Sequence, residues 1–183
     1  MLIGITGTNG AGKGTVVDYL VMEKGFSHYS ARFFIVEEIK KRGMEQNRES
    51  TREVANLLRK EHGPSYLMER LYDIAKEEPK AVLESVRTIG EAEFLKSKDA
   101  ILFAVDADRK LRYERIRARG SETDHVTFDE FCMQEDREMA SPDPWDMNVF
   151  GVMQLADARI ENNGTVEELR QKVDEALAEV TKR

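Results

Sequence analysis

Hydrophobic residues gather in five short runs that are separated by longer stretches with helical periodicity. The runs are residues 2–6, 26–30, 80–84, 100–106 and 158–161. Between them, apolar residues recur three and four positions apart, as on one face of an amphipathic helix. Parallel strands need crossover connections, and right-handed crossovers place helices on both faces of a sheet. The pattern therefore predicts a three-layer α/β fold with a parallel sheet of about five strands.

One segment departs from this alternation. Residues 120–148 contain Pro142, Pro144 and many charged side chains. Long irregular segments in compact domains are usually functional loops, so we expect a mobile insertion over the carboxyl edge of the sheet. The chain has 183 residues, which is long enough for one sizeable hydrophobic core and short for two independent domains. We therefore expect a single domain, 1–183.

Composition narrows the functional classes. Charged residues make up 34% of the chain and hydrophobic residues 40%, which is typical of a globular protein with a solvated surface. No apolar run approaches the roughly 18 residues of a membrane helix, and the start lacks the basic leader of a signal peptide. We expect a cytoplasmic protein with no membrane partner. The net charge of −7 argues against general attraction to nucleic acid.

The cysteine and histidine residues indicate neither a disulfide nor a metal site. Cys132 is the only cysteine, which excludes an internal disulfide and a cysteine-rich zinc site. The three histidines are scattered along the chain and make no metal-ligand pattern. Candidate chemistry must therefore come from other residue types.

A glycine-rich loop follows the first predicted strand and precedes the first predicted helix. Its sequence is GTNGAGKGT, residues 7–15. Glycines let the backbone wrap round an anion, the helix end adds positive potential, and Lys13 can reach the β- and γ-phosphates of a nucleotide. The usual phosphate loop has a hydroxyl directly after the lysine, whereas here Gly14 takes that place and Thr15 carries the hydroxyl.

This variant resembles the loop G-x-x-G-x-G-K-G-T of adenylate kinases and related nucleoside monophosphate kinases. The resemblance covers nearly the whole chain and extends to dephospho-CoA-kinase-like proteins. It implies a P-loop kinase fold in which residues of about 31–78 form acceptor-binding helices and residues of about 120–148 form a lid. It also implies ATP and Mg²⁺ as cofactors, with Thr15 near the metal. The residues expected to bind ATP are Gly7, Asn9, Gly10, Ala11, Gly12, Lys13, Gly14, Thr15 and Asn162.

Residues 84–87, with the sequence ESVR, stand where these kinases have Asp-Gly-x-Arg after a strand. By that resemblance Glu84 lies near magnesium and Arg87 grips the phosphate of the acceptor. Glutamate is one methylene longer than aspartate. Because Mg²⁺ keeps several waters, the contact of Glu84 with the metal can be direct or through water.

Further arginines follow the fourth strand. Arg115 and Arg119 lie four residues apart and share one face of a predicted helix. In the similar kinases, arginines at this helix and in the lid clamp phosphates, which makes Arg115, Arg119 and Arg137 candidates for catalysis together with Lys13 and Arg87. Given the acidic residues around Arg109 and Arg112, an ordinary surface helix is nearly as good an explanation for those two.

The acceptor is less clearly marked. Ser30 matches the serine that follows the second strand of adenylate kinases, but Val36 replaces their arginine, so Arg32 is the alternative acceptor ligand. We expect a monomer or homodimer that transfers the γ-phosphoryl group of ATP to a nucleoside or deoxynucleoside monophosphate. Dephospho-CoA kinase is an alternative. A slow ATPase that acts as a switch or assembly factor is an alternative of another class.

Overall fold

The computed structural model describes residues 1–121 and 125–182. Within them, five parallel strands form one sheet in the order β2-β3-β1-β4-β5. All five predicted strands and the three-layer architecture are confirmed. The strands are β1 (Leu2–Gly7), β2 (Ser27–Ser30), β3 (Ala81–Glu84), β4 (Ile101–Asp106) and β5 (Ala158–Glu161).

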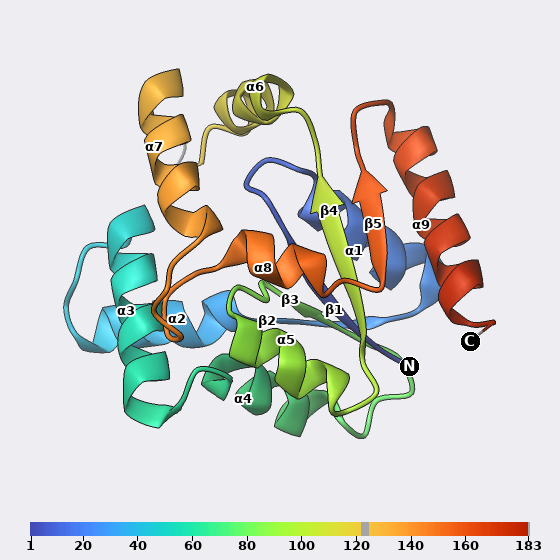
Figure 1. The fold of residues 1–183 in the computed structure, drawn as a ribbon, viewed down its shortest axis with the longest axis horizontal. Coiled ribbons are helices and arrows are strands. Elements are labelled where there is room, and N and C mark those ends of the chain that lie inside the picture. The colour runs from blue at the N-terminus through green and yellow to red at the C-terminus, as the bar shows by residue number, and fades with distance from the viewer. Residues whose placement is uncertain (122–124, 183) are drawn as a thin grey trace.

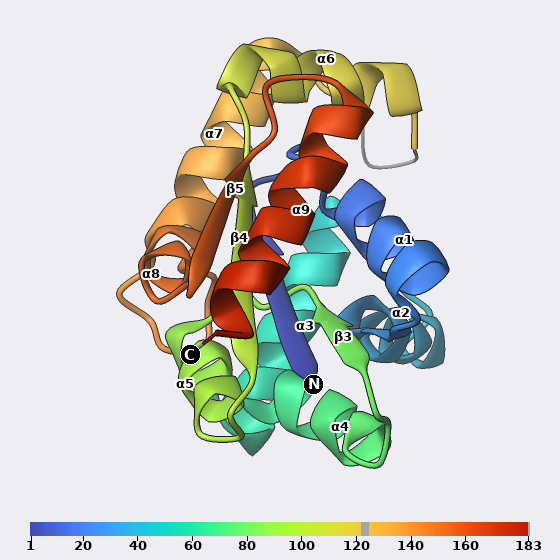
Figure 2. The ribbon, with the colours of Figure 1, turned by 90° about the vertical axis from the view of Figure 1, so that its right-hand side faces the viewer.

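Helices cover both faces of the sheet (Figures 1 and 2). The described helices are α1 (Lys13–Lys24), α2 (Ala31–Lys41), α3 (Arg48–His62), α4 (Tyr66–Ala75), α5 (Ile89–Lys96), α6 (Arg109–Arg119), α7 (Phe128–Met139), α8 (Val149–Gln154) and α9 (Val166–Val180). Helices α1 and α9 pack on one face, and α4, α5 and α8 pack on the other, with α2 and α3 beside them. None of these helices combines the length and the apolar composition needed to cross a bilayer.

Side chains of alternate strand residues build two separate cores. In β3, Val82 packs with α1 and α9, whereas Ala81 and Leu83 pack with the helices of the opposite face. Successive strand residues point to opposite faces, so a strand covered on both sides is apolar throughout. Two helix layers therefore hold the sheet rigidly, and the carboxyl ends of β1 and β3 reach a common edge.

The segment predicted as a lid contains helix α7, which lies between α6 and α3 (Figure 1). Glu135 of α7 forms an ion pair with Arg112 of α6, and the ring of Tyr113 lies 5.1 Å from that of Phe128. On its other side, Glu138 contacts Arg48 of α3. The segment thus bridges α6 and α3. Residues 122–124 of the predicted lid lie outside the described residues.

Candidate active site

The glycine-rich loop has a left-handed backbone conformation that favours glycine at Gly10 and Gly12, among other positions. Gly10 and Gly12 have φ angles of 77° and 98°. A Cβ atom on Gly10 would lie 2.5 Å from the carbonyl oxygen of Arg112, and one on Gly12 would lie 2.3 Å from Nδ2 of Asn162. Gly12 caps the start of α1 without a side chain, so the first backbone N–H groups of the helix are available to an anion.

Lys13 lies in the centre of this loop and is buried. Its Nζ atom donates hydrogen bonds to the carbonyl oxygens of Gly7, at 3.0 Å, and Thr8, at 2.6 Å. Burial, and then the nearby charge of Arg87, holds the pKa of Lys13 well below its ordinary value. An anion beside Lys13 would raise this pKa again, because a nearby negative charge favours the charged ammonium form.

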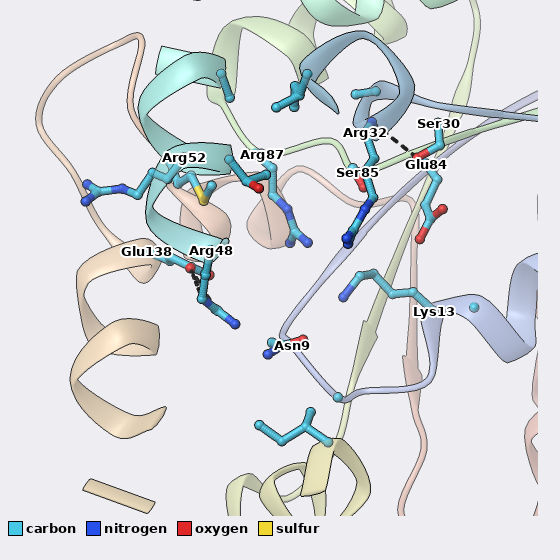
Figure 3. A pocket seen from close by; sticks show the side chains of 18 of the residues that line it. Asn9, Lys13, Ser30, Arg32, Arg48, Arg52, Glu84, Ser85, Arg87 and Glu138 are labelled. Atoms are coloured by element: carbon cyan, nitrogen blue, oxygen red, sulfur yellow. Dashed lines mark hydrogen bonds and ion pairs between the residues drawn. The ribbon is translucent and has the colours of Figure 1, made fainter. Parts of the chain in front are cut away.

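A cavity of about 630 Å³ opens from the loop toward α2 and α3 (Figure 3). Its size is within the range usual for small-molecule sites. Eight lysine and arginine residues line it, against three carboxylates, although the whole chain carries a net charge of −7. The cations are Lys13, Arg32, Arg48, Arg52, Arg59, Arg87, Arg115 and Arg119, and the carboxylates are Asp18, Glu84 and Glu138. The cavity is therefore suited to an anionic ligand.

Glu84 ends β3 directly beside β1 and the phosphate loop. Its Oε2 atom lies 3.0 Å from Nε2 of His28 on β2. The hydrogen bond from His28 lowers the pKa of Glu84 against the opposing effect of burial, so the carboxylate stays ionised. Ser85 follows with a φ of 78°, at the position where the resembling kinases have glycine. The left-handed turn is thus retained with a different residue.

Arg87 connects this turn to the phosphate loop. Its Nη1 atom donates to the carbonyl oxygen of Gly7 at 2.7 Å, the same oxygen that accepts from Lys13. Burial lowers the pKa of Arg87, and the charge of Glu138 is the largest influence in the opposite direction. One backbone oxygen thus holds two of the cations that line the cavity.

Most of the predicted site residues come together at this cavity. Those that line it are Asn9, Gly10, Gly12, Lys13, Gly14, Thr15, Ser30, Arg32, Glu84, Arg87, Arg115 and Arg119. Gly7 and Ala11 belong to the loop but are not among the lining residues. Thr15 follows the exposed Gly14 into the cavity, so the displaced hydroxyl keeps a place near the loop.

Two predicted residues lie elsewhere. Arg137 is exposed and outside the cavity lining, whereas its neighbour Glu138 lines the cavity. Asn162 is buried behind the phosphate loop, where its Nδ2 atom donates to the carbonyl oxygen of Ala11 at 2.9 Å. Adjacent residues of a helix point about 100° apart, so Arg137 faces away from the cavity that Glu138 lines. Asn162 supports the phosphate loop from outside the cavity.

The surface-helix interpretation of Arg112 was wrong. This side chain is 4% exposed, forms an ion pair with Glu135 and donates to the carbonyl oxygens of Ala107 and Asn9. It thus fastens α7 and the phosphate loop to α6. Arg109 is partly exposed and also pairs with Glu135. Acidic neighbours in the sequence gave no sign that the partner of Arg112 lies on another helix.

Helix α3 supplies lining residues that the sequence analysis missed. Arg48, Thr51, Arg52, Ala55 and Arg59 all line the cavity. Their spacings of three, four and seven residues place them on one helix face, which is a detectable signal. Arg48 pairs with Glu138, and Arg52 contacts Asp146, which also accepts a hydrogen bond from Asn56. These contacts join the predicted lid to α3.

Comparison with known proteins places the chain in a family. Residues 3–141 match the family model AAA_18, described as an AAA domain. A UPF0200 protein of Hyperthermus butylicus is 31% identical over 184 residues, covering 99% of this chain and 95% of that protein. The UPF0200 protein PH1008 of Pyrococcus horikoshii is 30% identical, with 98% and 97% covered. The chain belongs to the UPF0200 family and, through residues 3–141, to the AAA_18 family.

Solved structures similar to this UPF0200 member carry the names of several kinases. A shikimate kinase of Bacteroides thetaiotaomicron has a TM-score of 0.64 at 14% identity, with 100% of this chain and 99% of that chain covered. A gluconokinase of Sinorhizobium meliloti has a TM-score of 0.63 at 10% identity, with 98% and 93% covered. For dephospho-CoA kinase of Campylobacter jejuni the TM-score is 0.55 at 15% identity, with 100% and 98% covered. These likenesses establish the P-loop kinase fold and leave the acceptor open.

Proposed function

We propose that the protein is an ATP-dependent phosphotransferase that acts on a nucleoside or deoxynucleoside monophosphate, giving the diphosphate and ADP. The observation that carries this proposal is the single cavity that joins the phosphate loop to an arginine-lined wall. A donor and an anionic acceptor can meet there in one continuous cavity. Phosphoryl transfer needs such positioning and charge neutralisation more than covalent chemistry from the protein.

The donor side fits ATP with Mg²⁺. The cradle at Gly10 and Gly12 has no room for a Cβ atom, so its backbone can approach phosphate oxygens closely. Thr15 and Glu84 would hold the metal, which when bound supplies positive charge to the phosphates. No cluster of three or more His, Cys, Asp and Glu residues suited to a metal occurs in the described residues. Magnesium fits such a site because it takes few protein carboxylates and relies on phosphates and water.

The residues of the chain then have separable roles. Lys13 would leave the carbonyl oxygens of Gly7 and Thr8 to contact the transferring phosphoryl group. Arg87 would contact the phosphate of the acceptor while it remains beside the loop. Arg115 and Arg119 line the cavity from α6 and would neutralise further charge. The cavity walls would exclude water, which favours transfer over hydrolysis.

The acceptor wall supports a compact anion. Arg48 and Arg52 of α3 line the cavity with Arg87, and guanidinium groups recognise phosphate through paired hydrogen bonds. Arg32 and Ser30 complete this side at the start of α2. A monophosphate would satisfy these donors without a large ligand. These residues would contact only the phosphate group, so they do not distinguish one nucleotide base from another.

One observation favours a second acceptor class. Glu138 places a carboxylate in the cavity, where it would serve as a general base for a hydroxyl acceptor such as that of dephospho-CoA. A phosphate acceptor needs no such base. Both classes are therefore tested together.

The experiment measures ADP formation with each candidate acceptor. The panel contains ribo- and deoxynucleoside monophosphates, dephospho-CoA, shikimate and gluconate. We expect turnover that depends on one monophosphate class. Arg87→Ala should raise the KM for that acceptor at least about tenfold, the effect of losing about 1.4 kcal/mol. Arg42→Ala, at an exposed arginine that ends α2, is the matched control. Slow ADP formation that no acceptor stimulates would support the switch alternative and overturn the proposal.

A further inference from the structure

Arg59 and Glu91 form a buried ion pair between α3 and α5. Their side chains are 1% and 0% exposed, and Nε of Arg59 donates to Oε1 of Glu91 at 2.8 Å. A buried pair of this kind is often no more stable than an apolar pair of similar volume. The Nη1 atom of Arg59 is also buried without a hydrogen-bond partner among the described residues, which lowers stability further. Stability alone therefore does not account for the pair.

The second oxygen of Glu91 holds the backbone that carries Arg87. Oε2 accepts a hydrogen bond from the backbone N–H of Arg87 at 2.7 Å and from that of Thr88 at 3.2 Å. The hydroxyl of Thr88 in turn caps α5 by accepting from the N–H of Glu91. One carboxylate thus joins α3 to the residue proposed to contact the acceptor.

The connection continues from Arg87 to the phosphate loop through the carbonyl oxygen of Gly7. At its other end, Arg59 lines the cavity on the same helix face as Arg52 and Ala55. A ligand that contacts this face of α3 therefore acts on a helix that Arg59 joins to Glu91 of α5. Two short hydrogen bonds, from Arg59 to Glu91 and from the N–H of Arg87 to Glu91, thus connect α3 to the backbone of Arg87.

We propose that Arg59 is a positioning residue for Arg87 and acts through Glu91. The assignment of Arg87 to the acceptor rests on the proposed function. In this arrangement Arg59 fixes the carboxylate, the carboxylate fixes the N–H of Arg87, and the guanidinium of Arg87 is held between the loop and α3. Arg59 tunes the acceptor site without touching the acceptor itself.

The test separates positioning from folding. Arg59→Met alone would leave Glu91 charged and buried, which commonly unfolds a protein. We therefore use Arg59→Lys, which retains the ion pair, and the double variant Arg59→Met with Glu91→Gln, which removes the link and the buried charge together. Arg42→Lys, at an exposed ion-paired arginine outside the cavity lining, is the control. Circular dichroism and thermal unfolding establish that each variant is folded.

The acceptor KM should rise at least about tenfold in the double variant, with the KM for ATP within about twofold of wild type, since only the acceptor contact is displaced. Arg59→Lys should recover most of that loss. An unchanged acceptor KM in the folded double variant overturns the proposal. Equal losses in Arg59→Lys and the double variant also overturn it, because they would mean that the guanidinium of Arg59 contacts the acceptor directly.

A second readout does not depend on turnover. Hydrogen exchange at the amides of Arg87 and Thr88, followed by ¹⁵N NMR, should be at least about tenfold faster in the double variant and unchanged in Arg42→Lys. If the wild-type protein phosphorylates no acceptor, the proposed function fails while this measurement still tests the link. Equal exchange rates in the double variant and wild type would overturn the link itself.

Discussion

Replacing Glu138 by glutamine tests whether a carboxylate of the protein occupies the place of the acceptor anion. Oε1 of Glu138 accepts hydrogen bonds from Nε and Nη2 of Arg48, at 3.0 and 2.7 Å. The two side chains are 15% and 22% exposed. An incoming phosphate must compete with Glu138 for Arg48. Glutamine keeps the shape and an acceptor oxygen while it removes the charge.

The magnitude follows from this environment. Fully exposed ion pairs contribute about 0–1 kcal/mol, and hydrogen bonds to charged groups contribute about 1.5–3 kcal/mol. The Arg48–Glu138 pair lies between these cases, so we take about 1–2 kcal/mol as the competition that the variant removes. Since 1.4 kcal/mol is tenfold in affinity, the acceptor should bind about five to thirty times more tightly.

Isothermal titration calorimetry with the acceptor found in the screen measures this directly. Glu53→Gln, at an exposed carboxylate of α3, controls for the loss of one negative charge elsewhere. Weaker or unchanged binding in Glu138→Gln refutes the reasoning. A fall of kcat by more than about 100-fold with unchanged affinity refutes it in a specific way, because it identifies Glu138 as a general base for a hydroxyl acceptor.

Three further predictions concern other residues. Lys13→Ala should leave the circular dichroism spectrum intact and lower kcat more than about 100-fold, since a preorganised charge at the transferring group is worth several kcal/mol; a folded and fully active variant would contradict this. The hydrogen bond from His28 lowers the pKa of Glu84, so the carboxylate stabilises the fold above its ordinary pKa, and this contribution is lost as pH falls through the lowered value. Urea unfolding should therefore show a larger deficit for Glu84→Gln at pH 6 than at pH 3, and equal deficits would reject the argument. The fluorescence of Trp145, the only tryptophan, should change strongly with a dinucleoside pentaphosphate and slightly with either nucleotide alone. An unchanged spectrum at saturation, with binding confirmed by calorimetry, would mean that the predicted lid does not move at Trp145 or that the segment is not a lid.

Features that are local in the sequence were predictable. The five apolar runs gave the strands, because a buried parallel strand is apolar throughout and short. The loop at residues 7–15 was recognisable because its glycines, its lysine and its flanking strand and helix are contiguous. The placement of Glu84 and Arg87 near this loop was expected from the resemblance of residues 84–87 to the kinase segment, and the pairing of β1 with β3 brings the two strand ends to one edge of the sheet.

The side chains that complete the cavity depended on tertiary structure. Helical periodicity shows that Arg48, Arg52 and Arg59 share one face of α3, but it does not show that this face meets the phosphate loop. In α7, Glu138 lines the cavity whereas the adjacent Arg137 does not. Only the packing of α7 between α6 and α3 decides which of the two faces the cavity. Arg112 is buried for the same reason, because its partner Glu135 is 23 residues away in the chain. Periodicity relates residues within one helix, whereas the rotation of that helix about its axis is set by contacts with other elements.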